Sequence, residues 1–177
     1  MRCAALLRGV NVGGHNKIAM ADLRRILTDL GCADVITHLQ SGNAVFSSES
    51  GIDALAADIA GALAAQVGLT CAVMVRTSAE LAGIVSGHPL GREPDNPSRY
   101  FVAFLAGAPD AAAAAALTEL DLSPERAWVV NREAYLLCPN GAADTQLTNT
   151  FVEKRLGVAA TARNWNTVTK LAALTAG

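Results

Sequence analysis

One pattern restricts the fold of this chain more than any other feature: a six-element order that occurs twice along its 177 residues. In the first half, the apolar run "CAALL" predicts a buried strand, and residues 20–31 predict an amphipathic helix because their apolar side chains recur at helical spacing. Two extended runs joined by Ser41, Gly42 and Asn43 predict a hairpin. A long helix and a β-branched strand complete the order strand, helix, strand, strand, helix, strand, which is typical of a ferredoxin-like unit.

The second half predicts the same order, beginning with the strand "RYFVAFLAG" and ending with the short strand "VAATA". Between the halves, residues 87–98 contain three prolines and two glycines, a composition that favours a connecting loop. We therefore predict an α+β fold with two tandem ferredoxin-like subdomains, antiparallel sheets and a C-terminal helix. The predicted limits are 1–86 for the first subdomain, which carries an extra helix, 87–98 for the linker and 99–177 for the second subdomain.

The composition indicates a folded chain that carries little net charge. Hydrophobic residues make up 51% and charged residues 17% of the sequence, and the formal net charge is -2. Such a chain lacks the basic coat of strong non-specific nucleic-acid binders, so any anion site has to be local. No stretch reaches the roughly 18 strongly apolar residues of a membrane span, and the apolar run before Arg8 is too short for a signal peptide. We therefore expect a cytoplasmic protein without a membrane partner.

The reactive side chains are scattered and form no known catalytic or metal-binding motif. The four cysteines occur without a CxxC pair, which favours inert free thiols over disulfides, metal ligands or a nucleophile. The three histidines are isolated in the sequence, so we expect neither a metal nor a cofactor. We interpret His38 as a residue that fills a sheet face, and His88, in the proline-rich segment, as solvated.

The loop "RGVNVGGHNK", residues 8–17, matches a phosphate-binding loop only in part. Two of its glycines have the spacing of a Walker A loop, but His15 and Asn16 occupy the Lys and Ser/Thr positions, and the antiparallel topology is wrong for such a loop. What remains is a glycine-rich turn before a helix, with Arg8, His15 and Lys17 as basic groups. The alternative is a loop in which Gly and Asn merely satisfy unusual backbone angles.

The hairpin turn "QSGN" is expected to lie beside this loop. In the predicted topology the first two strands are parallel with the third between them, so the first loop and the hairpin emerge at the same sheet edge, roughly 10 Å apart at their roots. We predict a shared pocket for an anionic ligand, the alternative for Ser41 and Asn43 being turn hydrogen bonds only. The candidate residues are Arg8, Asn11, Gly13, Gly14, His15, Lys17, Gln40, Ser41 and Asn43.

The segment "TARNWNTVTKLAAL" supplies one further candidate. Asn164 predicts an N-cap, and the apolar spacing after it predicts a helix with Trp165 in the core. Arg163 precedes the helix N-terminus, where the helix dipole does not favour a positive charge. We therefore treat Arg163 as a candidate contact for an anionic ligand, the alternative being a carboxylate partner.

One known use of a ferredoxin-like sheet is not expected in this chain. RNA-recognition modules of this topology stack bases on aromatic side chains of the open sheet face. The central strands "CAALL" and "YFVAFLA" show no alternation of polar and apolar residues, and in the first half only Phe46 could serve as a platform. Both sheet faces are therefore predicted to be buried, which argues against RNA recognition of that type.

Three segments, "ALLRGVNVGGHNKIAMADLRRIL", "LQSGNAVFSS" and "TARNWNTVTKLAAL", resemble the start, first hairpin and end of the bacterial domain-of-unknown-function family 1697. The resemblance covers nearly the whole chain in the expected order. It implies tandem ferredoxin-like α+β subdomains, in agreement with the pattern above, and it implies no established activity. Family members commonly carry Lys where this chain has His15, which implies that a basic function of the loop is altered in this chain.

The sequence supports three kinds of function. The first is a binding module for an anionic ligand, either a phosphate-bearing small molecule such as a nucleotide or a nucleic acid, at residues 8–17 and 40–43. The second is a protein-interaction or structural role without a small ligand. The third is an enzyme with His15 or His38 as base and Ser41 as nucleophile, although no third group orients them. We rank the three in that order and assign no catalytic residue.

Overall fold

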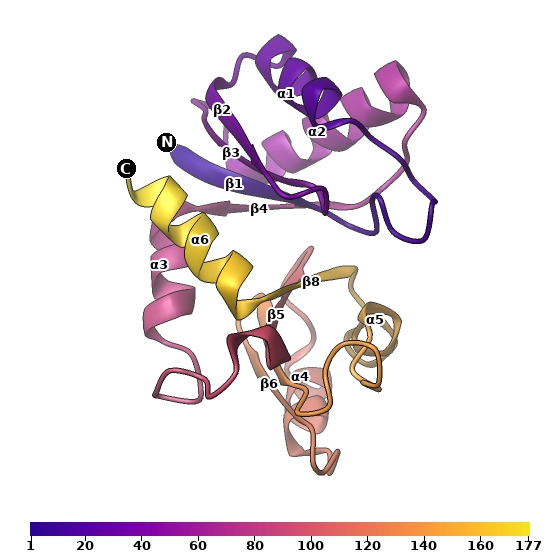
Figure 1. Cartoon of the computed structure of the whole chain (residues 1–177), viewed down its shortest axis with the longest axis vertical. Helices are drawn as coiled ribbons and strands as arrows, with labels where there is room; N and C mark the ends of the chain where they lie inside the picture. The colour runs from indigo at the N-terminus through magenta and orange to yellow at the C-terminus, as the bar shows by residue number, and fades with distance from the viewer. The chain divides into compact units, whose positions relative to one another are not determined.

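The computed structural model describes residues 1–177 and divides them into two compact units (Figure 1). The first unit contains Met1–Ala82 and Leu171–Gly177, and the second contains Gly83–Lys170. Each unit holds one four-stranded antiparallel sheet. The chain is therefore a mixed α and β protein with two such sheets and six α-helices, of which the last is C-terminal. None of these helices has the length and apolar character needed to cross a membrane.

The first unit follows the predicted order of elements. Its strands lie in the order β2-β3-β1-β4, and every neighbouring pair is antiparallel. Helices α1 and α2 cover one face of this sheet (Figure 1). The elements are β1 (Arg2–Leu7), α1 (Met20–Asp29), β2 (Ala33–His38), β3 (Asn43–Ser47), α2 (Ile52–Val67) and β4 (Val73–Thr77), followed by α3 (Ser78–Ser86).

The core of the first unit lies between its sheet and the two covering helices. On α1, the spacing of Leu23, Ile26 and Leu27 puts all three side chains in this core, as the amphipathic pattern predicts. Ala4 and Leu6 point to the opposite face of β1 and are also 0% exposed, so both faces of this central strand are buried. Phe46, the one candidate platform of this half, is 0% exposed as well, so its ring is not accessible to a stacking base.

The second unit repeats this topology. Its strands lie in the order β6-β7-β5-β8, again with antiparallel neighbours throughout. The elements are β5 (Tyr100–Leu105), α4 (Ala111–Glu119), β6 (Arg126–Val130), β7 (Glu133–Leu137), α5 (Asn149–Leu156) and β8 (Ala160–Asn164), with the short 3₁₀ helix η1 (Pro97–Arg99) before them and α6 (Trp165–Ala176) after them. Strands β6 and β7 form an antiparallel hairpin, which corresponds to the β2–β3 hairpin of the first unit.

Two helices begin at side chains that cap them, and the second of these caps, Asn164, is predicted from the sequence. The Asp110 carboxylate accepts hydrogen bonds from the amides of Ala112 and Ala113, so the alanine-rich run forms α4. At the start of α6, Asn164 Oδ1 accepts from the amide of Thr167 at 3.0 Å. Trp165 is only 2% exposed, which confirms its prediction as a core residue.

The prediction that His88 is solvated is wrong. Its ring packs against two aromatic rings of the second unit, with centroids 4.6 Å from Trp165 and 5.8 Å from Tyr100. Its Nδ1 atom is buried and has no hydrogen-bond partner. The prolines and glycines of this segment do indicate a loop, but composition does not reveal whether a loop folds back over aromatic residues or projects into solvent.

Candidate functional site

The loop between β1 and α1 is held together by backbone hydrogen bonds, and several of its residues have a left-handed backbone conformation. The amide of Asn11 donates to the carbonyl of Asn16 at 3.0 Å, and the amide of His15 donates to the carbonyl of Val12 at 3.0 Å. Five residues of the loop have positive φ angles, namely Gly9, Asn11, Gly13, Gly14 and Asn16. Gly and Asn therefore occupy the left-handed positions of this loop, and a role for the loop in anion binding stays a prediction.

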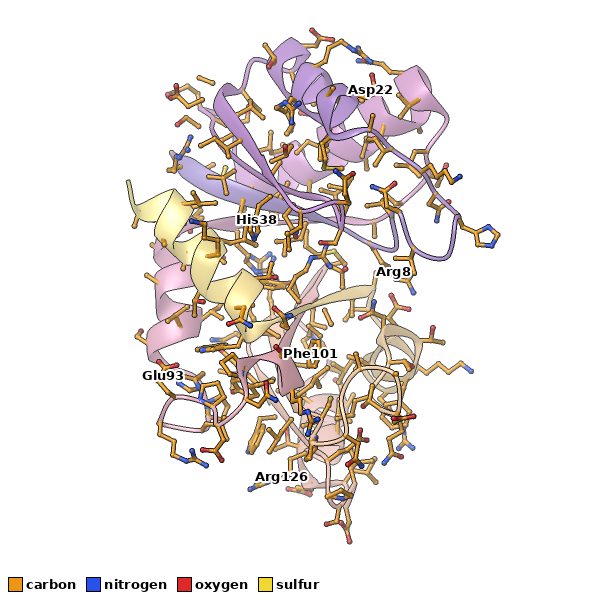
Figure 2. The ribbon with its side chains drawn as sticks, viewed as in Figure 1. Arg8, Asp22, His38, Glu93, Phe101 and Arg126 are labelled. Carbon is orange, nitrogen blue, oxygen red and sulfur yellow. The ribbon has the colours of Figure 1, made fainter.

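Asn11 joins this loop to the β2–β3 hairpin. Its Nδ2 donates to the carbonyl of Ile18 at 3.0 Å and to the carbonyl of Gln40 at 2.6 Å, while its Oδ1 accepts from the amide of Ile18 at 2.9 Å. A second link is the hydrogen bond from the amide of Leu7 to the carbonyl of Gly42 at 2.9 Å. The loop and the hairpin therefore meet at one sheet edge, as the predicted topology requires. Figure 2 marks Arg8, where β1 ends, and Asp22, in the first turn of α1.

A shallow groove of about 400 Å³ lies where the loop, the hairpin and the start of α1 meet. Lys17 is exposed and forms no ion pair. The side-chain amide of Gln40 is likewise exposed and has no hydrogen-bond partner. The groove thus presents one unneutralised ammonium group and one unsatisfied amide. Its lining residues are Asn11, Gly14, Lys17, Ile18, Ala19 and Gln40.

The N-terminus of α1 borders the groove without a side-chain cap. The N-cap residue is Ala19, which has no side chain able to accept a hydrogen bond, whereas Ser, Thr, Asp and Asn are preferred there. The first two helix amides, those of Met20 and Ala21, have no hydrogen-bond partner. Asp22 in the first turn is paired with Arg25 on the helix surface, at 3.5 Å. Asp22 partly offsets the positive end of the helix dipole, while the amides of Met20 and Ala21 stay free at the edge of the groove.

Some of the predicted candidates lie outside this groove. Gly13 and His15 are exposed at the turn of the loop but do not line the groove, and Arg8 is half-buried, with its amide bonded to the carbonyl of Ala72 at 2.9 Å. Asn43 is 0% exposed, and its Nδ2 donates to the carbonyl of His38 at 2.9 Å and to Ser41 Oγ at 3.0 Å. Ser41 and Asn43 therefore make turn hydrogen bonds, and a ligand role for these residues stays a prediction.

Arg163 lies in β8 of the second unit and is 8% exposed. Its guanidinium donates to Thr161 Oγ1 at 2.7 Å and to the carbonyl of Ala162 at 2.9 Å. Burial lowers the pKa of Arg163 to about 10, so the side chain keeps its positive charge at neutral pH. It is not among the residues that line the groove, and its role in anion binding stays a prediction.

Sequence reasoning missed two groove residues, Ile18 and Ala19. Ile18 is largely buried and its amide is held by Asn11, so it forms the floor where the loop enters α1. The signal that could have identified Ala19 is the absence of a capping residue directly before "MADLRRIL". A helix start that lacks Ser, Thr, Asp or Asn leaves amides available to a ligand.

The cysteines of the chain are free thiols in surroundings that suppress their reactivity. Burial raises the pKa of the Cys3 thiol to about 11, and burial also raises the thiol pKa values of Cys32, Cys71 and Cys138. No group of three or more His, Cys, Asp or Glu side chains is placed to hold a metal ion.

We expect the folded protein to resist alkylation by iodoacetamide at pH 8. The thiolate is the reactive form, and Cys3, with its pKa of about 11, is almost fully protonated at that pH. Any modification should begin at Cys71, the only cysteine that is not buried. Mass spectrometry after a fixed labelling time measures this, with the denatured protein as the control in which all four sites react. Labelling of Cys3 as fast in the folded as in the denatured protein would contradict this.

Comparison with known proteins places the chain in a family. The family model described as "Protein of unknown function (DUF1697)" matches residues 1–135, which include the loop, the hairpin and all groove residues. The chain belongs to this family. A solved structure similar to the DUF1697 chain is that of the conserved bacterial protein SP0830 from Streptococcus pneumoniae, with 22% sequence identity, a TM-score of 0.75 and coverage of 98% of each chain. At that identity the similarity concerns the fold. No curated protein matches the chain.

Proposed function

We propose that the groove of this DUF1697 protein binds a small ligand that carries an anionic group. The observation that carries the proposal is Lys17, an exposed ammonium group without an ion-pair partner that lines a concave surface. Hydrogen bonds from an ammonium group to a phosphate or carboxylate are roughly twice as strong as those between neutral groups. A ligand with such a group would gain this hydrogen bond without breaking an ion pair within the protein.

The neighbouring helix end supports the same proposal. The free amides of Met20 and Ala21 and the dipole of α1 favour negative charge at this position, and Ala19 leaves space where a capping side chain would lie. The Asn11 cross-link holds the loop and the hairpin together, so the groove is formed before a ligand arrives. A preformed site loses less entropy on binding than one that has to be ordered.

We also infer that each unit is a ferredoxin-like subdomain. The order strand, helix, strand, strand, helix, strand and the strand orders β2-β3-β1-β4 and β6-β7-β5-β8 support this inference. In the first unit, the loop after β1 and the hairpin after β2 then meet at one sheet edge because of this topology. The groove is thus a direct product of the inferred subdomain architecture.

Substitution of Lys17 by Ala is the test of the proposed function. We expect inorganic phosphate and nucleotides to raise the melting temperature of the wild-type protein at low salt. Lys17→Ala should weaken the affinity measured by calorimetry at least tenfold, about 1.4 kcal/mol, because a charge-assisted hydrogen bond is lost. Lys154→Ala is the matched control, because Lys154 is an exposed lysine of the second unit that does not line the groove.

The outcomes separate the three kinds of function. Binding that is unchanged in Lys17→Ala, or equally weakened in Lys154→Ala, rejects the groove as the anion site. The absence of any response to anions, together with a stable protein partner recovered by pull-down, favours the interaction role. Turnover of phosphoester or ester substrates that is lost in His15→Ala favours an enzyme.

A further inference from the structure

We propose that the second unit carries a separate pocket for a small uncharged molecule with an apolar body about the size of one ring and a hydrogen-bond acceptor, such as an amide oxygen. The pocket has a volume of about 230 Å³. One side of it is formed by the second sheet, with Phe101, Leu136 and Ala162, and the other by the segment before α5 and by Asn149, the first residue of that helix. Every residue that lines it belongs to the second unit, so the proposal does not depend on the anion site in the first.

The pocket exists because α5 is half as long as the helix at the same place in the first unit. Helix α2 contains 16 residues and α5 contains 8. Residues 139–148, "PNGAADTQLT", precede α5 as an irregular segment in which Leu147 is the one large apolar side chain. Helix α2 instead contributes Leu55, Ile59 and Leu63 to the core. The irregular segment therefore covers its sheet less completely than a helix with regularly spaced apolar side chains.

Phe101 shows the effect of this shorter cover. It occupies the same position in the second sheet as Cys3 in the first, since each is the second residue of its central strand. Cys3 is paired with Thr77, the last residue of β4, and Phe101 is paired in the same way with the last residue of β8. Cys3 is 0% exposed, whereas Phe101, labelled in Figure 2, is only half-buried although it packs against the core. A ligand that covers the phenyl ring would remove apolar surface from water.

Asn149 provides a free hydrogen-bond donor in the pocket. Its Oδ1 accepts from the amide of Ala162 at 3.1 Å, which fixes the orientation of the carboxamide group. Its Nδ2 forms no hydrogen bond within the protein. A ligand that excludes water from this donor has to supply an acceptor in its place, because an unpaired donor costs free energy once it is buried. The ligand therefore carries an acceptor next to its apolar body.

The charges around the pocket favour an uncharged ligand. Its lining contains no lysine, arginine, aspartate or glutamate, so a charged ligand would find no oppositely charged partner there. The Glu125 carboxylate lies next to the pocket wall, where it accepts from the amide of Gln146 at 3.3 Å. Burial raises the pKa of the Cys138 thiol, which lines the pocket, and the negative charge of Glu125 raises it further. The same negative charge disfavours an anion in this position.

The volume of the pocket sets the size of the ligand. An engineered apolar cavity of roughly 150 Å³ in another protein holds benzene. At about 230 Å³, the pocket of the second unit has room for one ring and a polar group of a few atoms. Sites for larger ligands have volumes of roughly 300–1,000 Å³. A nucleotide or a peptide is therefore too large for this pocket.

The test uses three probes that differ in one part each. Benzamide has a ring and an uncharged acceptor, benzoate has the same shape with a negative charge, and acetamide has the acceptor without the ring. Titration of the full chain followed by NMR gives the affinities and, through the backbone amides whose signals shift, the place of binding. We expect benzamide to bind about tenfold or more tightly than the other two probes and to shift the amides of Leu136, Thr148 and Ala162.

Two variants change the pocket in different ways. Ala162→Leu places a larger apolar side chain in the pocket and should weaken benzamide binding about tenfold or more. Asn149→Asp removes the Nδ2 donor and should have an effect of the same size. It keeps the acceptor for the amide of Ala162 and puts a negative charge in the first turn of α5, where the helix dipole favours it, so the fold is retained. Asn166→Asp, in the first turn of α6 and outside the pocket, is the matched control and should bind benzamide like the wild type.

The parts of the proposal fail on different results. The pocket is rejected if benzamide shifts none of its amides or binds to Ala162→Leu as tightly as to the wild type. Benzoate that binds as tightly as benzamide rejects the uncharged ligand, and acetamide that does so rejects the apolar body. Wild-type affinity for benzamide in Asn149→Asp rejects the acceptor. None of these measurements involves Lys17, so a failure here leaves the proposed anion site in the first unit intact.

Discussion

Gly42→Ala is expected to lower the free energy of unfolding by about 3 kcal/mol. Gly42 lies in the β2–β3 hairpin with a φ angle of +81°, a conformation that L side chains rarely adopt. A Cβ atom at this position would lie 2.5 Å from Val10 Cγ2 and 2.9 Å from Leu7 Cβ. Both neighbours are buried, so neither can move away without disturbing the junction of β1 with its loop. The substitution therefore combines backbone strain with a steric clash.

Urea denaturation followed by circular dichroism measures this effect, and Gly68→Ala is the matched control. Gly68 ends α2 with a φ angle of +66°, but a Cβ atom there would have no heavy atom within 4 Å. Gly68→Ala should lower the free energy of unfolding only by the cost of backbone strain, about 1 kcal/mol. Equal losses in the two variants would show that the close approach of Gly42 to Val10 and Leu7 has no energetic consequence.

Asn11→Ala is expected to cost about 2 kcal/mol of stability and to abolish anion binding in the groove. The substitution removes three hydrogen bonds, two to Ile18 and one to Gln40, that fix the loop at both ends. It also places alanine at a φ angle of +54°, which asparagine tolerates better. Because the groove is formed by the loop and the hairpin together, loss of this cross-link should separate its two sides.

Two further variants divide the effect of Asn11→Ala into its causes. Asn11→Gly keeps the left-handed backbone but loses every side-chain hydrogen bond, so it measures the cross-link without strain. Asn11→Asp keeps an acceptor for the amide of Ile18 but replaces the Nδ2 donor by an oxygen that faces two carbonyl groups. Chemical denaturation and calorimetry with phosphate are the two measurements. Wild-type stability and wild-type binding in Asn11→Gly would reject the cross-link as the support of the groove.

Much of the secondary structure could be predicted because it depends on local patterns. The spacing of Leu23, Ile26 and Leu27 determines which side of α1 is buried, and the Asp110 and Asn164 side chains determine where α4 and α6 begin. The contact between the β1–α1 loop and the β2–β3 hairpin also follows from the order of the elements along the chain. These features depend on the sequence near each element and on the topology that short connections permit.

The composition of the candidate site could be predicted only in part. Asn11, Gly14, Lys17 and Gln40 line the groove, but His15, on the same loop, does not line it. Side-chain direction in a loop depends on the individual φ and ψ angles of each residue, and these have no periodicity that a sequence reveals. The aromatic packing of His88 was missed for the same reason, since its partners Trp165 and Tyr100 are distant from it in the sequence.

The first unit is built from two separate stretches of the chain, and this affects the order in which its parts become available during synthesis. Residues 171–177 belong to the unit that is otherwise built from residues 1–82, and Leu171 and Thr175 in this segment are almost completely buried. Synthesis runs from the N-terminus, so a ribosome makes these residues after the whole second unit. The unit that begins to emerge first therefore acquires its complete set of residues only after the second unit has been synthesised, and an expressed fragment that stops at residue 86 lacks part of the unit it is meant to represent.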